Sequence, residues 1–558
     1  MTDRLRAGFA VVASASTRRE LSRAPPSAAI ENARSRGRLR ASLTPMRVAL
    51  PNLRGALVPA AIAFGVLIVA LSFAQITADQ PLVGLAVPGV LLVAIVCSRW
   101  PALMVLVLLV LVGAYGSLAA FLSIPAGPVL DALLAGLWIS VLYSYVVKSR
   151  TRPLWVWPGL ALLLLYLVVS FFQIWTALGV SLGLFSFKYS SWYMMAVPLL
   201  AFAGWKLRTY IRISHALVFV ALAVGLYALF RLIVGVSGAE WGASLAAAGR
   251  FNTVGGELSL IGSFPNRHEL ANWSAGMVPF CLAIALTPGK TLWRLAAAAA
   301  VPLSVVALFG TDVRAALAAA GAGAAIVIAL NLVASRGRGR PLAQALVALV
   351  LAIVGGTTLF TMVLDEQETE RYGAILNPEG DTAFEARLIR WEAVLEELDE
   401  HPLGFGLGTG GRLANEGKVP FVTLGRYSID NAYLKIAYEQ GFPVLALYIA
   451  ALLALLVGLA RRAVRARAGP VRGMAIGATG ALSANLVIFM FSIWIESIAI
   501  MYLWIAVGAA IGALGAIREE EMKRTGEDPE MRSNVRPPRE PVPVQPERGR
   551  AEPALPRA

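Results

Sequence analysis

The segment DNAYLKIAYEQG, residues 430–441, closes a polar interval that begins near residue 365. This interval is the only long polar segment between apolar runs, and it carries most of the ionisable groups that could perform chemistry. We therefore interpret the apolar sequence before and after it as a membrane scaffold that holds this loop over one face of the bilayer.

The composition supports this interpretation. Of the 558 residues, 58% are hydrophobic and only 15% are charged, and the mean hydropathy is +0.68. A soluble domain carries about a quarter charged residues. The deficit of charge is explained if most of the chain lies in lipid, so the composition predicts an all-α, polytopic integral membrane protein.

Most apolar runs reach the roughly 20 residues that cross the hydrocarbon core. We predict about fourteen transmembrane helices (12–14), eleven of them within residues 54–364 and three within residues 431–517. Residues 1–53 and 518–558 are rich in Arg, Pro or mixed charge, and we expect both tails to be disordered. The predicted spans lie near residues 56–76, 82–98, 101–121, 127–147, 154–176, 189–205, 213–235, 266–287, 292–310, 313–334, 342–364, 434–460, 472–494 and 497–517.

Basic residues occur in alternate connections between these runs, which predicts that those connections face the cytoplasm. Both tails are then cytoplasmic, and the 365–430 loop lies on the outer face of the plasma membrane. The opposite connections are nearly free of Lys and Arg, with Lys188 and Arg250 as exceptions. The formal charge of +15 is therefore explained by topology and an anionic leaflet rather than by nucleic acid. The basic connections hold Arg99, Lys148, Arg150, Arg152, Lys206, Arg208, Arg212, Lys290, Arg294, Arg336, Arg338, Arg340, Arg461, Arg462, Arg465 and Arg467.

One helix is predicted inside the loop. An apolar stripe at steps of three and four residues runs along it, and Arg387 and Arg390 lie off that stripe. The helix should end at His401-Pro402. The glycine-rich segment 404–411 follows no strand, so we interpret it as flexible packing of the loop and not as a nucleotide site. The stripe consists of Phe384, Leu388, Trp391, Leu395 and Leu398.

Ionisable side chains gather near the outer ends of the predicted spans. Each of them alone could be an interfacial side chain that reaches water, but their clustering at one depth favours a functional site under the loop. They are Arg231, Arg267, His268, Glu269, Asp312, Arg314, Asp430, Lys435, Glu439 and Glu496.

Several of these groups are arginines, whose guanidinium forks match phosphate oxygens. A ligand with a phosphate at headgroup depth and a long apolar tail is a lipid-linked diphosphate. Nearby aromatic residues suit sugar faces, or they belong to the interface belt and the core. The arginines are Arg231, Arg267, Arg314, Arg387 and Arg390, and the aromatic residues are Trp273, Trp391, Tyr427, Tyr433 and Tyr438.

The segment 430–441 resembles the motif His-Asn-x-Tyr-Leu followed by Glu-x-Gly of the O-antigen ligase and polymerase superfamily. Three further stretches agree with this family: RW (390–391) ahead of PLGFGLGT (402–409), GSFPN (262–266) with LA (270–271), and Arg314 at the start of a span. The order and spacing of these loose motifs make their combination fairly specific.

The resemblance implies a membrane glycosyltransferase of the GT-C type, which uses no metal, nucleotide sugar or other cofactor. Such an enzyme moves a glycan from undecaprenyl diphosphate to an acceptor hydroxyl outside the membrane. From the resemblance we favour a polysaccharide polymerase, with an O-antigen ligase proper as the alternative. Arginines would neutralise charge on the leaving diphosphate, and a general base would take the hydroxyl proton.

Where the family ligases carry His, this chain has Asp430. An ionised aspartate can also accept a proton, so we predict Asp430, Arg314 and Arg390 as catalytic residues. Asp430 could instead cap the helix that follows it, or do both. The predicted substrate-binding residues are Arg231, Arg267, His268, Arg387, Asn431, Tyr433, Lys435 and Glu439.

Purely structural roles remain open for some of these residues. His268 could be a satisfied interfacial histidine, and His401 could be a helix terminator. Lys435 and Glu439 are four residues apart on one helix and could pair with each other.

Two other classes of protein remain open. A transporter or flippase of lipid-linked glycans should carry polar groups at the bilayer midplane and paired broken helices. A non-catalytic membrane subunit would need Arg314, Arg390 and Asp430 only for assembly.

Overall fold

The computed structural model describes residues 95–122, 126–146, 157–177, 179–248, 252–254, 257–335, 382–411 and 429–525. The chain divides into residues 1–64 and residues 65–558, and all described residues belong to the second unit. The whole N-terminal tail lies outside the described residues, as do the predicted spans near 56–76 and 342–364, most of the span near 82–98 and most of the C-terminal tail.

Ten segments of the described part of the chain are long and apolar enough to cross a membrane. The prediction of an all-α, polytopic membrane protein is therefore confirmed. The segments are built on α4 (Pro101–Leu122), α5 (Ala126–Val146), α6 (Pro158–Phe172), α9 (Leu207–Val234), α11 (Arg267–Leu286), α12 (Thr291–Gly310), α13 (Arg314–Ser335), α19 (Phe442–Arg465), α20 (Pro470–Ile488) and α21 (Met501–Thr525).

Three of these helices form the centre of the bundle. The membrane-crossing segments of α11, α20 and α21 have 89%, 78% and 83% of their length buried inside the protein. The other seven segments are at most half buried. Small residues let the central helices approach closely, as is usual between membrane helices. A Cβ added to Gly323 of α13, for example, would lie 2.7 Å from the carbonyl oxygen of Gly480 in α20.

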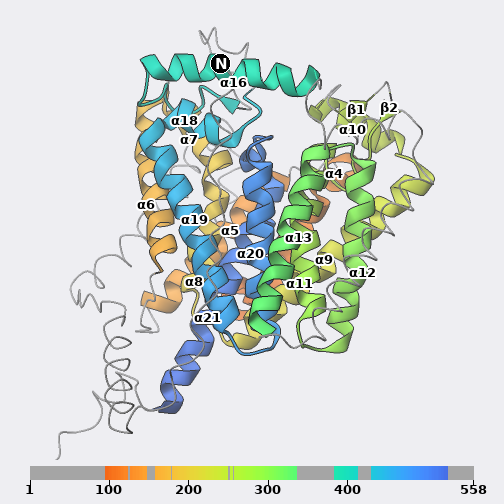
Figure 1. Ribbon diagram of the computed structural model, residues 1–558, viewed down its shortest axis with the longest axis vertical. Coiled ribbons are helices and arrows are strands. Elements are labelled where there is room, and N and C mark those ends of the chain that lie inside the picture. Colours follow the sequence, from red (N-terminus) through yellow and green to blue (C-terminus); the bar gives the residue numbers. More distant parts are fainter. Residues whose placement is uncertain are drawn as a thin grey trace, which may run out of the picture. The chain divides into compact units, whose positions relative to one another are not determined.

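The shorter elements gather at one end of the bundle, which we call the α16 end (Figure 1). Here the only strands among the described residues form a small antiparallel hairpin. The elements at this end are α7 (Val180–Ser190), α10 (Gly238–Ala248), β1 (Thr253–Val254), β2 (Glu257–Leu258), α16 (Thr382–Glu400) and α18 (Ala432–Gln440).

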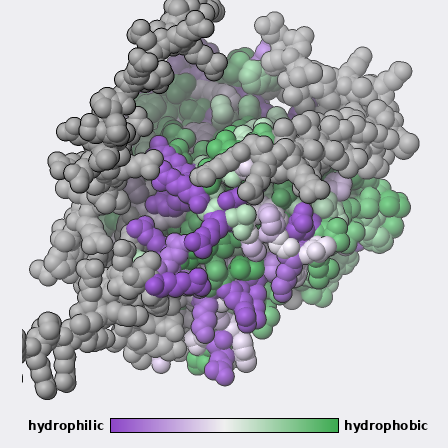
Figure 2. Space-filling view, turned by 60° about the horizontal axis from the view of Figure 1, so that its bottom comes forward, coloured by the Kyte–Doolittle hydropathy of each residue, from purple (hydrophilic) through white to green (hydrophobic). Residues whose placement is uncertain are grey.

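At the opposite end lie the connections from α8 (Ala196–Phe202) to α9, from α11 to α12 and from α19 to α20. Hydrophilic residues gather on this face (Figure 2). We call it the arginine end, because Arg208, Arg212, Arg461, Arg465 and Arg467 are exposed in or beside these connections.

Two predicted spans are interrupted. The span expected at residues 189–205 is a shorter apolar helix of residues 192–202, and the sequence did not predict α7 before it. The span expected at residues 434–460 breaks at Gly441, which separates α18 from α19 with φ of 85°. Lys188, an exception to the charge pattern, lies in α7 and pairs with Asp131 of α5 at 2.5 Å.

The loop helix exists as predicted, but only part of its predicted apolar stripe is buried. Leu388 and Leu395 are 45% and 43% exposed, whereas Val394 and Leu398 are at most 2% exposed. The buried pair packs with Ile429 and with Ala437 and Tyr438 of α18. The inward face of α16 therefore continues through Trp391 to the partly buried Arg390 and Arg387.

Candidate functional site

The site begins with an ion pair between the loop helix and the segment that precedes α18. Nη1 of Arg390 lies 3.5 Å from Oδ2 of Asp430. Both side chains are about one-third exposed, at 39% and 35%, so a ligand in solution or at the headgroup level can reach them. Two of the three predicted catalytic residues, Arg390 and Asp430, are thus brought together, with the carboxylate oriented by a guanidinium.

Capping of α18 falls to Asn431. Its Oδ1 accepts hydrogen bonds from the backbone N–H groups of Tyr433, at 2.9 Å, and Leu434, at 3.1 Å. This is the N-cap arrangement, so the interpretation of Asp430 as the cap is wrong. The carboxylate of Asp430 is directed to Arg390 instead.

Arg387 lies one turn before Arg390 on the same inward face, and it is half-buried. No side-chain hydrogen bond or ion pair joins Arg387 or His268 to another described residue. Arg387 and Arg267 both act electrostatically on His268, which places the three groups near one another at the start of α11. Two arginines near the start of α11 are suited to an anionic ligand.

The start of α11 is tied to the turn between α12 and α13. Nη1 of Arg267 donates to Oγ of Ser259 at 3.4 Å, and this hydroxyl donates to Oδ2 of Asp312 at 3.0 Å. Arg314 begins α13 two residues after Asp312. Arg267 and Arg314 are thus held at the same end of neighbouring helices, and α11 packs against α13.

Lys435 and Glu439 form a buried charge cluster with Glu496. Nζ of Lys435 lies 2.6 Å from Oε2 of Glu439 and 3.0 Å from Oε1 of Glu496, and none of the three side chains is more than 4% exposed. The ammonium also donates to Oγ of Ser190 in α7. In this structure Lys435 and Glu439 pair with each other, and no surface is left on either side chain for a substrate.

The cluster holds two carboxylates and one ammonium. Burial raises the pKa of the Glu439 carboxyl, Lys435 opposes this rise, and the neighbouring Glu496 adds to it. The attraction of Lys435 therefore offsets part of the cost of burying two carboxylates side by side.

The glycine-rich segment 404–411 was predicted to be flexible packing, and that prediction is wrong. The segment is a tightly hydrogen-bonded strap over the end of α18. Its backbone N–H groups at Gly408 and Gly410 donate to Oε1 of Glu439 at 3.1 and 3.2 Å. Those at Phe405 and Gly406 donate to the last carbonyl groups of α18. The segment is thus an anion-binding nest whose anion is a carboxylate of the same chain.

Two glycines make this contact possible. A Cβ on Gly404 would lie 2.6 Å from the backbone nitrogen of Gly441, and one on Gly441 would lie 2.6 Å from the backbone carbon of Leu403. Both glycines also have positive φ, which disfavours other residues. The Glu-x-Gly part of the motif therefore has a structural basis, since the carboxylate and the glycine both receive the strap.

We expect Gly404→Ala to lower the thermal stability of the purified protein strongly, because the new methyl group meets backbone that cannot move aside. Gly410→Ala is the matched control in the same strap. Its methyl group would find its nearest neighbour at 3.4 Å, an ordinary contact, and we expect little change. Equal melting temperatures for the two variants in a thermal unfolding assay would contradict this account.

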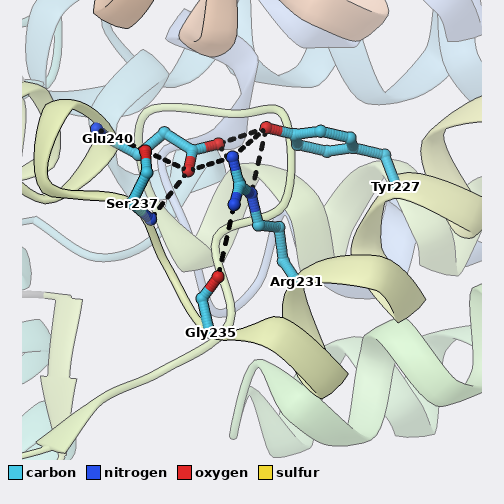
Figure 3. A network of polar contacts seen from close by, with 5 residues as sticks. All are labelled: Tyr227, Arg231, Gly235, Ser237 and Glu240. Atoms are coloured by element: carbon cyan, nitrogen blue, oxygen red, sulfur yellow. Dashed lines mark hydrogen bonds and ion pairs between the residues drawn. The ribbon is translucent and has the colours of Figure 1, made fainter.

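Arg231 does not join the site around Asp430. It pairs with the buried Glu240 at 2.7 Å and donates to the hydroxyl of Tyr227 and the carbonyl of Gly235 (Figure 3). Oε2 of Glu240 also accepts from the backbone and hydroxyl of Ser237, a capping box at the start of α10. All these groups satisfy one another, so Arg231 fixes the turn from α9 to α10.

The candidate aromatic residues are mainly packed. The Tyr433 hydroxyl donates to the carbonyl of Leu486, and Tyr438 stacks on Phe405 and donates to Glu397. Trp273 is 1% exposed. Trp391 remains partly exposed beside Arg390 and is the one suited to a sugar face; Tyr427 lies outside the described residues.

Sequence reasoning missed the uncharged partners of Glu439 and Gln440 at the end of α18. Ser186 donates to Glu439, and Ser170 donates to Gln440, across 253 and 270 residues of sequence. The only signal in the sequence was the spacing of Lys435 and Glu439, which lie four residues apart. Among the described residues, no group of three or more His, Cys, Asp or Glu side chains could hold a metal ion.

Ten apolar helices and a polar site gathered at one end define a polytopic membrane protein with a candidate site at the membrane surface. Residues 298–449, which run from α12 into α19, match the family model described as O-antigen ligase. The resemblance to the O-antigen ligase superfamily is thereby confirmed; the matched stretch includes Arg314, Arg390 and Asp430. No curated protein matches the chain.

Proposed function

We propose that this protein is a metal-independent glycosyltransferase of the O-antigen ligase or polymerase kind, acting at the outer face of the plasma membrane. It transfers a glycan from undecaprenyl diphosphate to an acceptor hydroxyl, and both chain termini are cytoplasmic. The observation that carries the proposal is the inward face of α16. On this face Arg390 meets Asp430, and the side chain of Arg387 has no partner among the described residues but lies near Arg267 and His268.

In the proposed reaction, the oxygen of the acceptor hydroxyl attacks the anomeric carbon while Asp430 accepts the hydroxyl proton. The bond from that carbon to the diphosphate oxygen breaks, and the undecaprenyl diphosphate leaves with the bonding electrons. Arg387, Arg267 and Arg314 neutralise the negative charge on this leaving group. Arg390 orients Asp430 and keeps its carboxylate available to the acceptor.

Several residues predicted to bind substrate are assigned supporting roles in this proposal. Asn431 caps α18, Tyr433 packs beneath it, and Lys435 with Glu439 holds the strap. His268 remains a candidate substrate contact because it has no partner of its own among the described residues.

The test is glycan profiling of a deletion strain complemented with wild type or with Arg387→Gln, with membrane levels measured. A polymerase predicts that short lipid-linked repeat units accumulate in Arg387→Gln while long polymer disappears. A ligase predicts full-length lipid-linked polymer that lacks its final acceptor. Arg208→Gln, at the exposed arginine end, is the matched control and should leave the glycans unchanged. Unchanged glycans in Arg387→Gln at a normal membrane level would contradict the proposal.

A transporter of lipid-linked glycans is the second candidate, and interrupted helices favour it. The α7–α8 and α18–α19 segments are both broken, and they meet at the Lys435 cluster. Broken helices of this kind are common in transporters. Purified protein in liposomes separates the two, since a transporter moves lipid-linked glycan between leaflets without forming a new glycosidic bond.

A further inference from the structure

A second cluster of charge lies at the arginine end, far along the helices from Asp430. One member is Arg462, near the end of α19. The guanidinium carbon of Arg462 lies 3.8 Å from the ring centroid of Trp157, the residue before α6, and Nη1 donates to the carbonyl of Gly458. The side chain is thus held flat against an indole at the end of the bundle.

Other arginines act electrostatically on Arg462. Arg518 and Arg465 both repel the guanidinium of Arg462. Within the described residues, no carboxylate forms an ion pair with Arg461, Arg462, Arg465, Arg467 or Arg472. Like charges held this close are stabilised when an external anion lies between them.

The lipid-facing surface of α19 leads directly to this cluster. Ile449, Leu453 and Val457 are 36%, 49% and 43% exposed, and they follow one another at intervals of one turn. Arg461 and Arg465 continue the same spacing and are also exposed. The row therefore runs from apolar side chains to cationic ones, which complements the apolar acyl chains and the anionic headgroup of a phospholipid.

We propose that the corner formed by Trp157, Arg461, Arg462 and Arg465 binds the phosphodiester headgroup of an anionic phospholipid. The acyl chain lies along Ile449, Leu453 and Val457, and the guanidinium forks of Arg461 and Arg465 hold the phosphate oxygens. Trp157 fixes Arg462 at the interface, where tryptophan is favoured. This inference is independent of the proposed glycosyltransferase activity.

The test is thermal unfolding of the purified full chain in detergent with added dioleoyl-phosphatidylglycerol, dioleoyl-phosphatidylcholine or inorganic phosphate. Of the three additives, we expect only phosphatidylglycerol to raise the melting temperature of the wild type. The double variant Arg461→Gln with Arg465→Gln should lose at least half of that rise. Arg462 is left in place, because its contact with Trp157 also supports packing.

The matched control is Arg208→Gln with Arg212→Gln, which removes the same charge from exposed positions at the same end. It should keep the full rise. An equal loss in both double variants would indicate diffuse attraction and overturn the site. The proposal also fails if phosphatidylglycerol gives no rise, or if inorganic phosphate gives the same rise as the lipid.

Discussion

Lys435→Met is expected to remove most of the folded protein from the membrane. Methionine keeps much of the volume of the side chain, but it leaves Glu439 and Glu496 facing each other at no more than 4% exposure. Removing one partner of a buried ion pair costs about 3–5 kcal/mol. We expect a lower membrane level and a large fall in melting temperature, measured by size-exclusion chromatography of detergent extracts after heating.

Glu439→Gln is the matched control for this prediction. It removes one of two carboxylates, so Lys435 keeps Glu496 as a one-to-one partner, and the amide oxygen can still accept from Gly408 and Gly410. Its melting temperature should lie close to that of the wild type. The triple variant Lys435→Met, Glu439→Gln, Glu496→Gln should recover part of the lost stability. A Lys435→Met protein as stable as the wild type would show that the two buried carboxylates do not need the ammonium.

Asp430→Asn is expected to reduce glycan transfer by roughly 10²–10⁴-fold, the contribution of a positioned general base. The amide has nearly the same shape but cannot accept the acceptor proton. The folded protein should persist at the level of the wild type, because Asn431 caps α18. The measurement is the initial rate of transfer from a lipid-linked donor by purified protein in liposomes.

Two variants sharpen this experiment. Asp399→Asn removes an exposed carboxylate from the end of α16 and should leave the rate unchanged. Asp430→His introduces the residue of the family ligases and should retain more activity than Asp430→Asn, since a neutral imidazole accepts a proton. An Asp430→Asn protein with the wild-type rate would exclude Asp430 as the base.

The membrane architecture was readable from the sequence, because hydrophobic length is a local property that needs no knowledge of neighbours. The ends of α11, α12 and α13 fall within a few residues of the predicted spans. The existence of α16 was equally clear from its periodicity. Asn431 occupies the N-cap, whereas the adjacent Asp430 was the residue considered for that role, since both types favour it.

Local pattern could not decide which face of α16 is buried. Two faces of this helix carry apolar residues, and only the position of α18 selects Val394 and Leu398 over Leu388 and Leu395. That selection turns Arg390 toward Asp430.

The sequence by itself therefore determined a polytopic membrane protein with a polar loop and the residue types of an anionic site. Only the tertiary structure decided which of those residues face a ligand and which support the fold. Lys435 and Glu439 are bonded to Ser190 and Ser186, which lie 245 and 253 residues earlier in the chain. Such pairings depend on how broken helices pack together, and no local periodicity records them.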